Sequence, residues 1–278
     1  MQALAAGDRV MLLDAKKRRY LLNLADGGEF HTHAGFVPHD DIIGRSEGVM
    51  VRSTKGAEYT VLRPTLEDYV IGMPRGAQVI YPKDLATICM LADIGPGMRV
   101  FETGVGSGAM SMTMLRYGAD IVGYELRDDF ARRAVANVRE FMGESVLDRF
   151  DVQIADSYEG IDAALGSFDR AVLDLPEPWR VVPHLEACLH PGAVCVAYTP
   201  SIVQAQQVRE TFRGLWIDAR TIEVLHRGWH IDGQAVRPDH RMVAHTAFLS
   251  VARFLGRENR AIRTDPKVER LGGARPRR

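Results

Sequence analysis

From Met98 onward, short apolar runs alternate with amphipathic stretches of helical length. This pattern strongly limits the possible folds, because it favours an α/β architecture with a doubly wound, mostly parallel sheet. The predicted strands are "RVFETG", "DIVGYEL", "FDVQIAD", "FDRAVLDL" and "AVCVAYTP". The predicted helices are "GAMSMTMLRYG", "DDFARRAVANVREFMG", "VVPHLEACLHPG" and "SIVQAQQVRETFRGL", the last with Ser201 as its N-cap.

Two further strands are predicted near the C-terminus, "TIEVLHRGWHI" and "HTAFLSVARFLG", with no helix between them. The link "DGQAVRPDHRMVA" is rich in turn formers and is predicted to be a turn-like connection. A late antiparallel strand pair on a parallel sheet is therefore expected.

The first part of the chain has a different pattern, with short strands and turns and a basic turn at residues 16–19. We predict a small β-rich N-terminal domain over residues 1–65, the α/β domain over residues 66–256, and a polar basic tail over residues 257–278. The stretch "EFHTHAGFVPHDDIIG" holds His31, His33 and His39. Their spacing does not define a metal site, so we expect a solvated loop and no metal.

Net charge, cysteine content and hydrophobicity exclude few classes of protein. The net charge is −1, which gives no global basic field but leaves room for a local basic face. The three cysteines have no metal-ligand spacing, and reduced thiols predict a cytoplasmic protein. No apolar run approaches the roughly 20 residues that span a bilayer, so no membrane partner is expected.

The stretch "FETGVGSGAM" joins the first predicted strand to its helix. Gly104, Gly106 and Gly108 allow a tight turn and a close approach of the backbone to a ligand. With Ala109, these glycines also satisfy the G-x-G-x-x-G/A dinucleotide fingerprint, so a nicotinamide enzyme is one alternative.

Acidic residues at three successive strand tips favour another ligand. Glu102 precedes the glycines, where a carboxylate would repel a pyrophosphate but attract an ammonium group. Glu125 ends the second strand, where it can accept both ribose hydroxyls, and Asp156 ends the third, where an adenine edge would lie. A ligand with an ammonium group, a ribose and an adenine but no phosphate is S-adenosylmethionine.

Several stretches resemble one family. "VFETGVGSGAMSMTML", "GYELR", "DLPEPW", "YVIGMPRGAQVIYPKDLATI" and "HRGWHIDGQAVRPDHRMVAHTAFL" are similar to the class I methyltransferases that make N1-methyladenosine at position 58, in the T-loop of tRNA. The resemblance runs from about residue 6 to about residue 255 and fits the archaeal and bacterial homotetrameric form best. It implies a Rossmann-like sheet, S-adenosylmethionine as the cofactor, tRNA as the substrate and a homotetramer, and a neighbouring adenine is a possible second target.

The resemblance also implies residue roles. The implied cofactor-binding residues are Glu102, Gly104, Val105, Gly106, Ser107, Gly108, Ala109, Glu125, Asp156, Gln78 and Tyr81. At one position some relatives carry a histidine where this chain has Phe130, so any cofactor contact there would be stacking.

The acid of "DLPEPW" is the implied catalytic residue. Asp174 ends the fourth strand, where a carboxylate can accept from the N6 amine of adenine and stabilise the positive charge that grows as N1 is methylated. Pro176 and Pro178 would fix the loop. Implied substrate-binding residues are Trp179, which covers the base or only packs under the loop, and Arg237, His240 and His245.

Two alternatives share this sequence evidence. One is a class I methyltransferase that acts on a small molecule or a protein side chain. The other is a non-catalytic subunit that only binds tRNA, although such a subunit would be expected to lose the glycine loop or the strand-tip acid, and this chain keeps both.

Overall fold

The computed structural model describes residues 3–76 and 78–259. It consists of two compact units, and the boundary in the chain lies between Pro74 and Arg75. Helix α1 (Leu66–Gly72), which falls in the predicted second domain, packs with the N-terminal unit, where Asp68 pairs with Arg19 at 2.5 Å. Most of the predicted tail lies outside the described residues.

The N-terminal unit is a small β structure. Its sheet has the order β2-β1-β6-β5, and a separate hairpin pairs β3 with β4. The strands are β1 (Arg9–Asp14), β2 (Arg19–Asn23), β3 (Glu29–Thr32), β4 (Gly35–Pro38), β5 (Met50–Arg52) and β6 (Glu58–Leu62). Alternate apolar residues such as Val10 and Leu12 of β1 and Val61 of β6 form its core.

The expectation of a solvated histidine loop was wrong. Residues 29–38 form the β3–β4 hairpin, because the apolar side chains of Phe30 and Val37 pack on the core of this unit. His39 is buried, and its Nδ1 accepts a hydrogen bond from the Ala25 N–H at 3.0 Å. His31 and His33 are exposed, and no group of side chains able to hold a metal occurs among the described residues.

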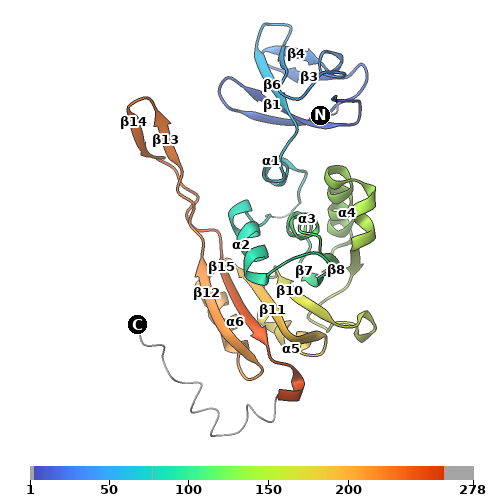
Figure 1. Cartoon of the computed structure of the whole chain (residues 1–278), viewed down its shortest axis with the longest axis vertical. Helices are drawn as coiled ribbons and strands as arrows, with labels where there is room; N and C mark the ends of the chain where they lie inside the picture. The colour runs from blue at the N-terminus through green and yellow to red at the C-terminus, as the bar shows by residue number, and fades with distance from the viewer. Residues whose placement is uncertain (1–2, 77, 260–278) are drawn as a thin grey trace. The chain divides into compact units, whose positions relative to one another are not determined.

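The C-terminal unit is built on a seven-stranded sheet of order β12-β15-β11-β10-β7-β8-β9 (Figure 1). Its strands are β7 (Arg99–Thr103), β8 (Asp120–Glu125), β9 (Phe150–Ile154), β10 (Phe168–Leu173), β11 (Leu189–Thr199), β12 (Trp216–Glu223) and β15 (Phe248–Phe254). β7 to β11 pair in parallel, and β15 pairs antiparallel with both β11 and β12. The predicted doubly wound sheet with a late antiparallel pair is confirmed.

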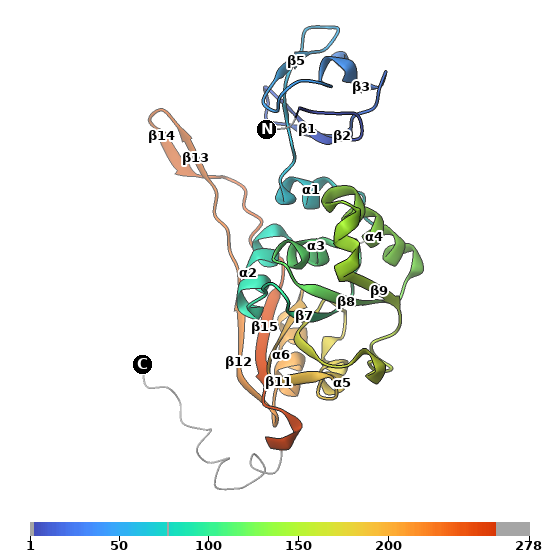
Figure 2. The same ribbon diagram turned by 45° about the vertical axis from the view of Figure 1, so that its right-hand side comes forward.

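Helices cover both faces of this sheet (Figure 2). α2 (Pro82–Ala92), α3 (Ala109–Arg116) and α4 (Asp128–Met142) lie side by side, and α5 (Val182–Leu185) and α6 (Ile202–Thr211) cover the other face. Ser201 caps α6 as predicted, since its Oγ accepts from the Gln204 N–H and the Gln204 side chain accepts from the Ser201 N–H. In the described part of the chain, no helix has the length and apolar character to cross a membrane.

Two predicted elements have different bounds in the structure. The helix predicted over residues 181–192 ends at Leu185, because β11 begins at Leu189 to pair with Phe168 of β10. The strand predicted over residues 221–231 is divided, because β12 ends at Glu223 and β13 (Trp229–Asp232) is a separate strand. β13 pairs with β14 (Ala235–Pro238), which lies in the link predicted to be turn-like, and the two form an arm that extends beyond β12 and β15 (Figure 1).

Candidate active site

The carboxyl ends of β7 to β10 surround a cavity of about 700 Å³. Strand register explains the convergence, because Leu173 lies beside Thr103 and Thr103 beside Tyr124, so the residues that follow them share one edge of the sheet. The cavity is lined by Gln78, Thr103, Gly104, Gly106, Tyr124, Glu125, Leu126, Arg127, Phe130, Ala155, Asp156, Ser157, Tyr158, Asp174, Leu175, Pro176 and Glu177.

The glycine loop requires its glycines for different reasons. Gly104 has φ +82°, and a Cβ there would lie 1.9 Å from the carbonyl oxygen of Asp174. Gly106 has φ +58°, but a Cβ there would make only an ordinary contact, 3.8 Å from the Gly104 carbonyl oxygen. The Asp174 N–H also donates to the Thr103 carbonyl at 3.0 Å, so the glycine loop and the acid of the fourth strand are in direct contact.

The Glu125 carboxylate is held at the end of β8 by two backbone donors. Its Oε2 accepts from the Gly106 N–H at 2.9 Å and its Oε1 from the Arg127 N–H at 3.0 Å. Asp156 is fixed in a similar way, because its Oδ1 accepts from the Tyr158 N–H at 2.9 Å. Each carboxylate therefore has a defined orientation before any ligand arrives.

Glu102 lies behind the loop and does not line the cavity. It is only 2% exposed, and its Oε2 accepts from the Ser111 hydroxyl of α3 at 2.7 Å. Burial, with smaller contributions from the nearby Asp174 and Glu125, raises the pKa of Glu102 to about 8. Burial and the charge of Glu125 likewise raise the pKa of Asp174 to about 7.

No described cation forms an ion pair with Glu102, Glu125, Asp156 or Asp174. Arg127 and Arg180 lie near Glu125 and Asp156 without forming ion pairs with them. Repulsion between the carboxylates still contributes to the raised pKa values of Glu102 and Asp174, and a positively charged ligand would relieve it. The arrangement thus favours a cation over an anion such as a pyrophosphate, which argues against the nicotinamide alternative.

The residues present fit S-adenosylmethionine, which carries an ammonium and a sulfonium group. The Ser107 hydroxyl of the glycine loop is buried and has no hydrogen-bond partner among the described residues, as expected for a group that awaits a polar ligand. Glu125 suits the ribose hydroxyls. Leu126 and Phe130 supply an apolar wall, with the Arg127 guanidinium 3.9 Å from the centre of the Phe130 ring.

The cavity brings together six of the predicted site residues: Gln78, Gly104, Gly106, Glu125, Asp156 and Asp174. Others lie outside its wall: Glu102, Val105, Ser107, Gly108, Ala109, Tyr81, Trp179, Arg237, His240 and His245. Trp179 packs on the apolar core beneath the loop, and Tyr81 is the N-cap of α2. Arg237 belongs to β14 in the arm, and His240 follows it.

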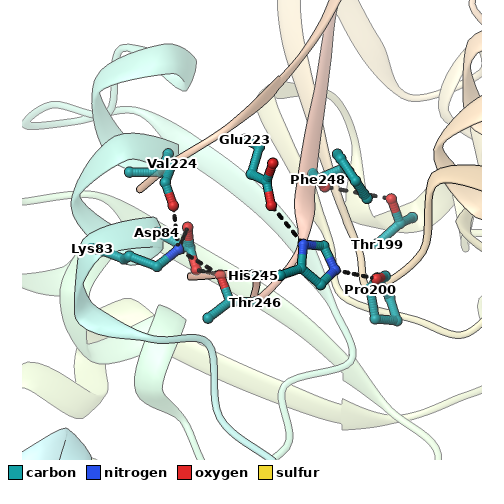
Figure 3. A network of polar contacts seen from close by, with 9 residues as sticks. All are labelled: Lys83, Asp84, Thr199, Pro200, Glu223, Val224, His245, Thr246 and Phe248. Carbon is teal, nitrogen blue, oxygen red and sulfur yellow. Dashed lines mark hydrogen bonds and ion pairs between the residues drawn. The ribbon is translucent and has the colours of Figure 1, made fainter. Parts of the chain in front are cut away.

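His245 lies at the base of the arm rather than in the cavity wall. Its ring joins Glu223 Oε1 and the Pro200 carbonyl, each at 2.7 Å (Figure 3). Both ring nitrogens face acceptors, so these contacts raise the pKa of His245. In this structure the side chain joins β12 to the end of β11.

A buried polar cluster adjoins His245 (Figure 3). The Lys83 ammonium donates to Asp84 Oδ1 and the Val224 carbonyl at 2.8 Å each, and to Thr246 Oγ1 at 2.5 Å. Thr246 Oγ1 in turn donates to Asp84 Oδ2 at 2.6 Å. Val224 and Thr246 flank the arm, so Lys83 fastens both ends of the arm to the start of α2.

Sequence reasoning missed several residues of the wall, among them Tyr124, Arg127 and Tyr158. Each lies within two positions of a predicted strand-tip acid, so the neighbours of Glu125 and Asp156 were the available signal. Arg127 and Tyr158 lie in the loops after β8 and β9, whose course the apolar pattern does not specify, whereas Tyr124 lies within β8.

Comparison with known proteins gives a consistent result. The family model described as tRNA methyltransferase complex GCD14 subunit matches residues 58–247, and the model described as TrmI-like N-terminal matches residues 3–51. A Thermus thermophilus protein named tRNA (adenine(58)-N(1))-methyltransferase TrmI is 37% identical over 248 residues, 88% of this chain and 96% of that protein. A Methanocaldococcus jannaschii relative has the name tRNA (adenine(57)-N(1)/adenine(58)-N(1))-methyltransferase TrmI. It is 31% identical, and the match covers 87% of this chain and 94% of that protein.

Solved structures agree in fold. The tRNA (m1A58) methyltransferase TrmI from Aquifex aeolicus superposes with a TM-score of 0.80 at 26% identity, covering 91% of this chain and 99% of that one. A Thermotoga maritima protein described as a SAM-dependent O-methyltransferase gives a TM-score of 0.86 at 30% identity, covering 92% and 96%.

Proposed function

The chain belongs to the TrmI-type family of tRNA (adenine 58-N1)-methyltransferases, and on that premise we propose that Asp174 is the residue that orients and activates the target base. The enzyme methylates N1 of adenine 58 in tRNA and depends on S-adenosylmethionine. Methylation of adenine 57 as well is recorded in the name of the M. jannaschii relative.

When bound, S-adenosylmethionine supplies a methyl group attached to a positively charged sulfur. The glycine loop, Glu125 and Asp156 would hold it, with their carboxylates already oriented by backbone donors. Side chains that are already oriented in this way need no rearrangement when the cofactor binds. The adenine must leave its stack to reach a cavity at the strand tips.

Adenine N1 needs no strong base, because its lone pair is already nucleophilic. It needs orientation, and it needs stabilisation of the positive charge that spreads over N1 and N6 as the new N–C bond forms. The Asp174 carboxylate can accept a hydrogen bond from N6 and face that growing charge. Its pKa of about 7 also suits it to take an N6 proton afterwards.

The observation that supports this role most strongly is the position of Asp174 in the cavity wall. Asp174 lies against the glycine loop. It follows β10, whereas the expected cofactor acids belong to β7, β8 and the segment after β9. Incubating the purified chain with tRNA and isotope-labelled S-adenosylmethionine, followed by mass spectrometry of nucleosides, tests the activity. Labelled N1-methyladenosine at position 58 is expected, and label that appears only in a small molecule or a protein would contradict it.

We further propose that the chain assembles as a homotetramer through its arm. In the β13–β14 hairpin, Trp229 pairs with Pro238 and Ile231 with Val236, so these apolar side chains share one face. Trp229, Ile231 and Val236 are 56%, 72% and 60% exposed. A two-stranded hairpin is marginally stable alone, and an exposed apolar face of this kind suits a second copy of the chain.

Binding of tRNA is expected to rest on phosphate contacts. Lys16 to Arg19 form an exposed basic turn of the N-terminal unit, in which Asp14 and Asp68 orient the two arginines. A tetramer would combine several such turns, which would reconcile a net charge of −1 with a polyanionic substrate.

A further inference from the structure

The loop that carries Asp174, residues 174–179, is held by two side chains from outside it. The Tyr158 phenol oxygen accepts from the Glu177 N–H at 3.0 Å. On the other side, Gln204 Nε2 donates to the Pro176 carbonyl at 2.9 Å. One contact comes from the segment after β9 and the other from the first turn of α6.

The composition of the loop makes these contacts important. Pro176 and Pro178 have no N–H, so the loop has few backbone donors with which to fix itself. The Asp174 N–H is already bonded to Thr103, which leaves the Glu177 N–H as a main anchoring donor. The Tyr158 phenol oxygen accepts a hydrogen bond from the Glu177 N–H, so this side chain replaces a backbone hydrogen bond that the loop does not make.

Tyr158 is itself firmly fixed. Its N–H donates to Asp156 Oδ1 at 2.9 Å, and its carbonyl contacts His184 Nε2 at 3.1 Å. The Arg180 guanidinium lies 4.2 Å from the centre of its ring and pairs with Glu177 at 3.0 Å. Tyr158 therefore links Asp156, expected at the adenine of the cofactor, to the loop that carries Asp174.

We propose that Tyr158 and Gln204 are positioning residues that hold the Asp174 loop in its productive place, with Tyr158 aligning it to the cofactor side of the cavity. This rests on the proposed role of Asp174. Misplacement of a catalytic group by about 1 Å can cost about a hundredfold in rate, so contacts outside the reacting atoms are expected to matter.

Two conservative variants test the proposal. Tyr158→Phe keeps the ring and its Arg180 contact but removes the acceptor for Glu177. Gln204→Glu keeps the α6 cap, because a carboxylate oxygen still accepts from the Ser201 N–H, but it has no N–H for Pro176. Each should lower kcat about tenfold, leave the cofactor Kd within about twofold, and leave the KM for tRNA nearly unchanged.

The pH dependence of kcat distinguishes a displaced Asp174 loop from a non-specific loss of activity. A loop that moves outward would admit water to Asp174, so the acidic midpoint of the kcat profile should shift to lower pH in Tyr158→Phe, the variant that adds no charge. Tyr117→Phe, at the exposed C-terminal end of α3, is the matched control and should change neither kcat nor the midpoint.

Unchanged kcat and midpoint in both variants, or a loss of kcat matched by an equal loss of cofactor affinity, would overturn the proposal. Asp174→Ala measured in parallel distinguishes the two claims. If Asp174→Ala is inactive while the two variants behave as wild type, only the positioning proposal fails. If Asp174→Ala retains the wild-type rate, the proposed role of Asp174 fails, and the positioning proposal fails with it.

Discussion

At the scale of single residues, the site depends on a close backbone contact and on the charges of a few carboxylates. The backbone of Gly104 touches the backbone of Asp174, so the cofactor loop and the catalytic loop are in contact at one point. Glu125, Asp156 and Asp174 share one cavity edge, and none of them forms an ion pair with a described cation. Both features lead to predictions that single substitutions can test.

The glycine loop offers a matched pair of substitutions. Gly104→Ala adds a Cβ 1.9 Å from the Asp174 carbonyl oxygen at a positive φ, and the backbone there cannot move aside cheaply. Gly106→Ala adds a Cβ at an ordinary contact distance, 3.8 Å from the Gly104 carbonyl oxygen, so its main cost is the left-handed backbone. We expect a loss in the free energy of unfolding of about 3 kcal/mol or more for Gly104→Ala and about 1 kcal/mol for Gly106→Ala, measured by urea denaturation. Equal losses would show that contact with the Asp174 backbone is unimportant.

The raised pKa of Glu102, about 8, predicts that cofactor binding releases a proton. The Glu102 carboxyl is largely protonated near pH 7 in the free enzyme, and a cationic ligand favours its ionised form. Affinity should therefore rise with pH from about 6 to 8 and then level off. Calorimetry in two buffers of different ionisation enthalpy measures the release, and Glu102→Gln should reduce it. An affinity independent of pH would contradict this electrostatic account.

At the scale of elements, the arm and the cluster at its base form one unit. Lys83 bonds to Val224 and Thr246, which flank the arm, and its charge is matched by the fully buried Asp84. A buried pair of this kind is costly to break from one side only, because the remaining charge has no partner.

Lys83→Met should therefore destabilise the protein by about 3 to 5 kcal/mol, measured by urea denaturation. The double variant Lys83→Met with Asp84→Asn removes the orphan charge and should recover part of the loss. Limited proteolysis within residues 225–245 should accelerate in the single variant, since the arm loses its fastening. A wild-type stability for Lys83→Met would show that the cluster does not hold the arm.

The elements also show what a sequence can specify. The alternation after Met98 predicted the sheet. Of the acids at the strand tips, Glu125, Asp156 and Asp174 line one cavity, because parallel strands end at one edge, whereas Glu102 is buried behind the glycine loop. The β13–β14 hairpin was missed because residues 229–231 were assigned to one longer strand, and because Asp232, Gly233 and Pro238 favoured a turn-like link over residues that form β14. The ties from Tyr158 and Gln204 join segments far apart in sequence, so no local pattern predicts them.

At the scale of the whole molecule, assembly is expected to depend on the apolar face of the arm. Light scattering should give a mass near four times 30.9 kDa for the wild-type chain. Ile231→Glu places a charge on the apolar face and should lower that mass, whereas His230→Glu, on the opposite face of the same hairpin, should not. A tetramer that survives Ile231→Glu would exclude this face as the contact.

The central claim is that the charge of Asp174 drives methyl transfer, and single-turnover kinetics test it most directly. Asp174→Ala and Asp174→Asn should both bind S-adenosylmethionine with nearly wild-type affinity. Both should methylate tRNA about a hundredfold to a thousandfold more slowly, because the amide keeps the shape of the carboxylate but cannot stabilise a growing positive charge. A wild-type rate in either variant, or a loss of cofactor affinity as large as the loss of rate, would contradict the account.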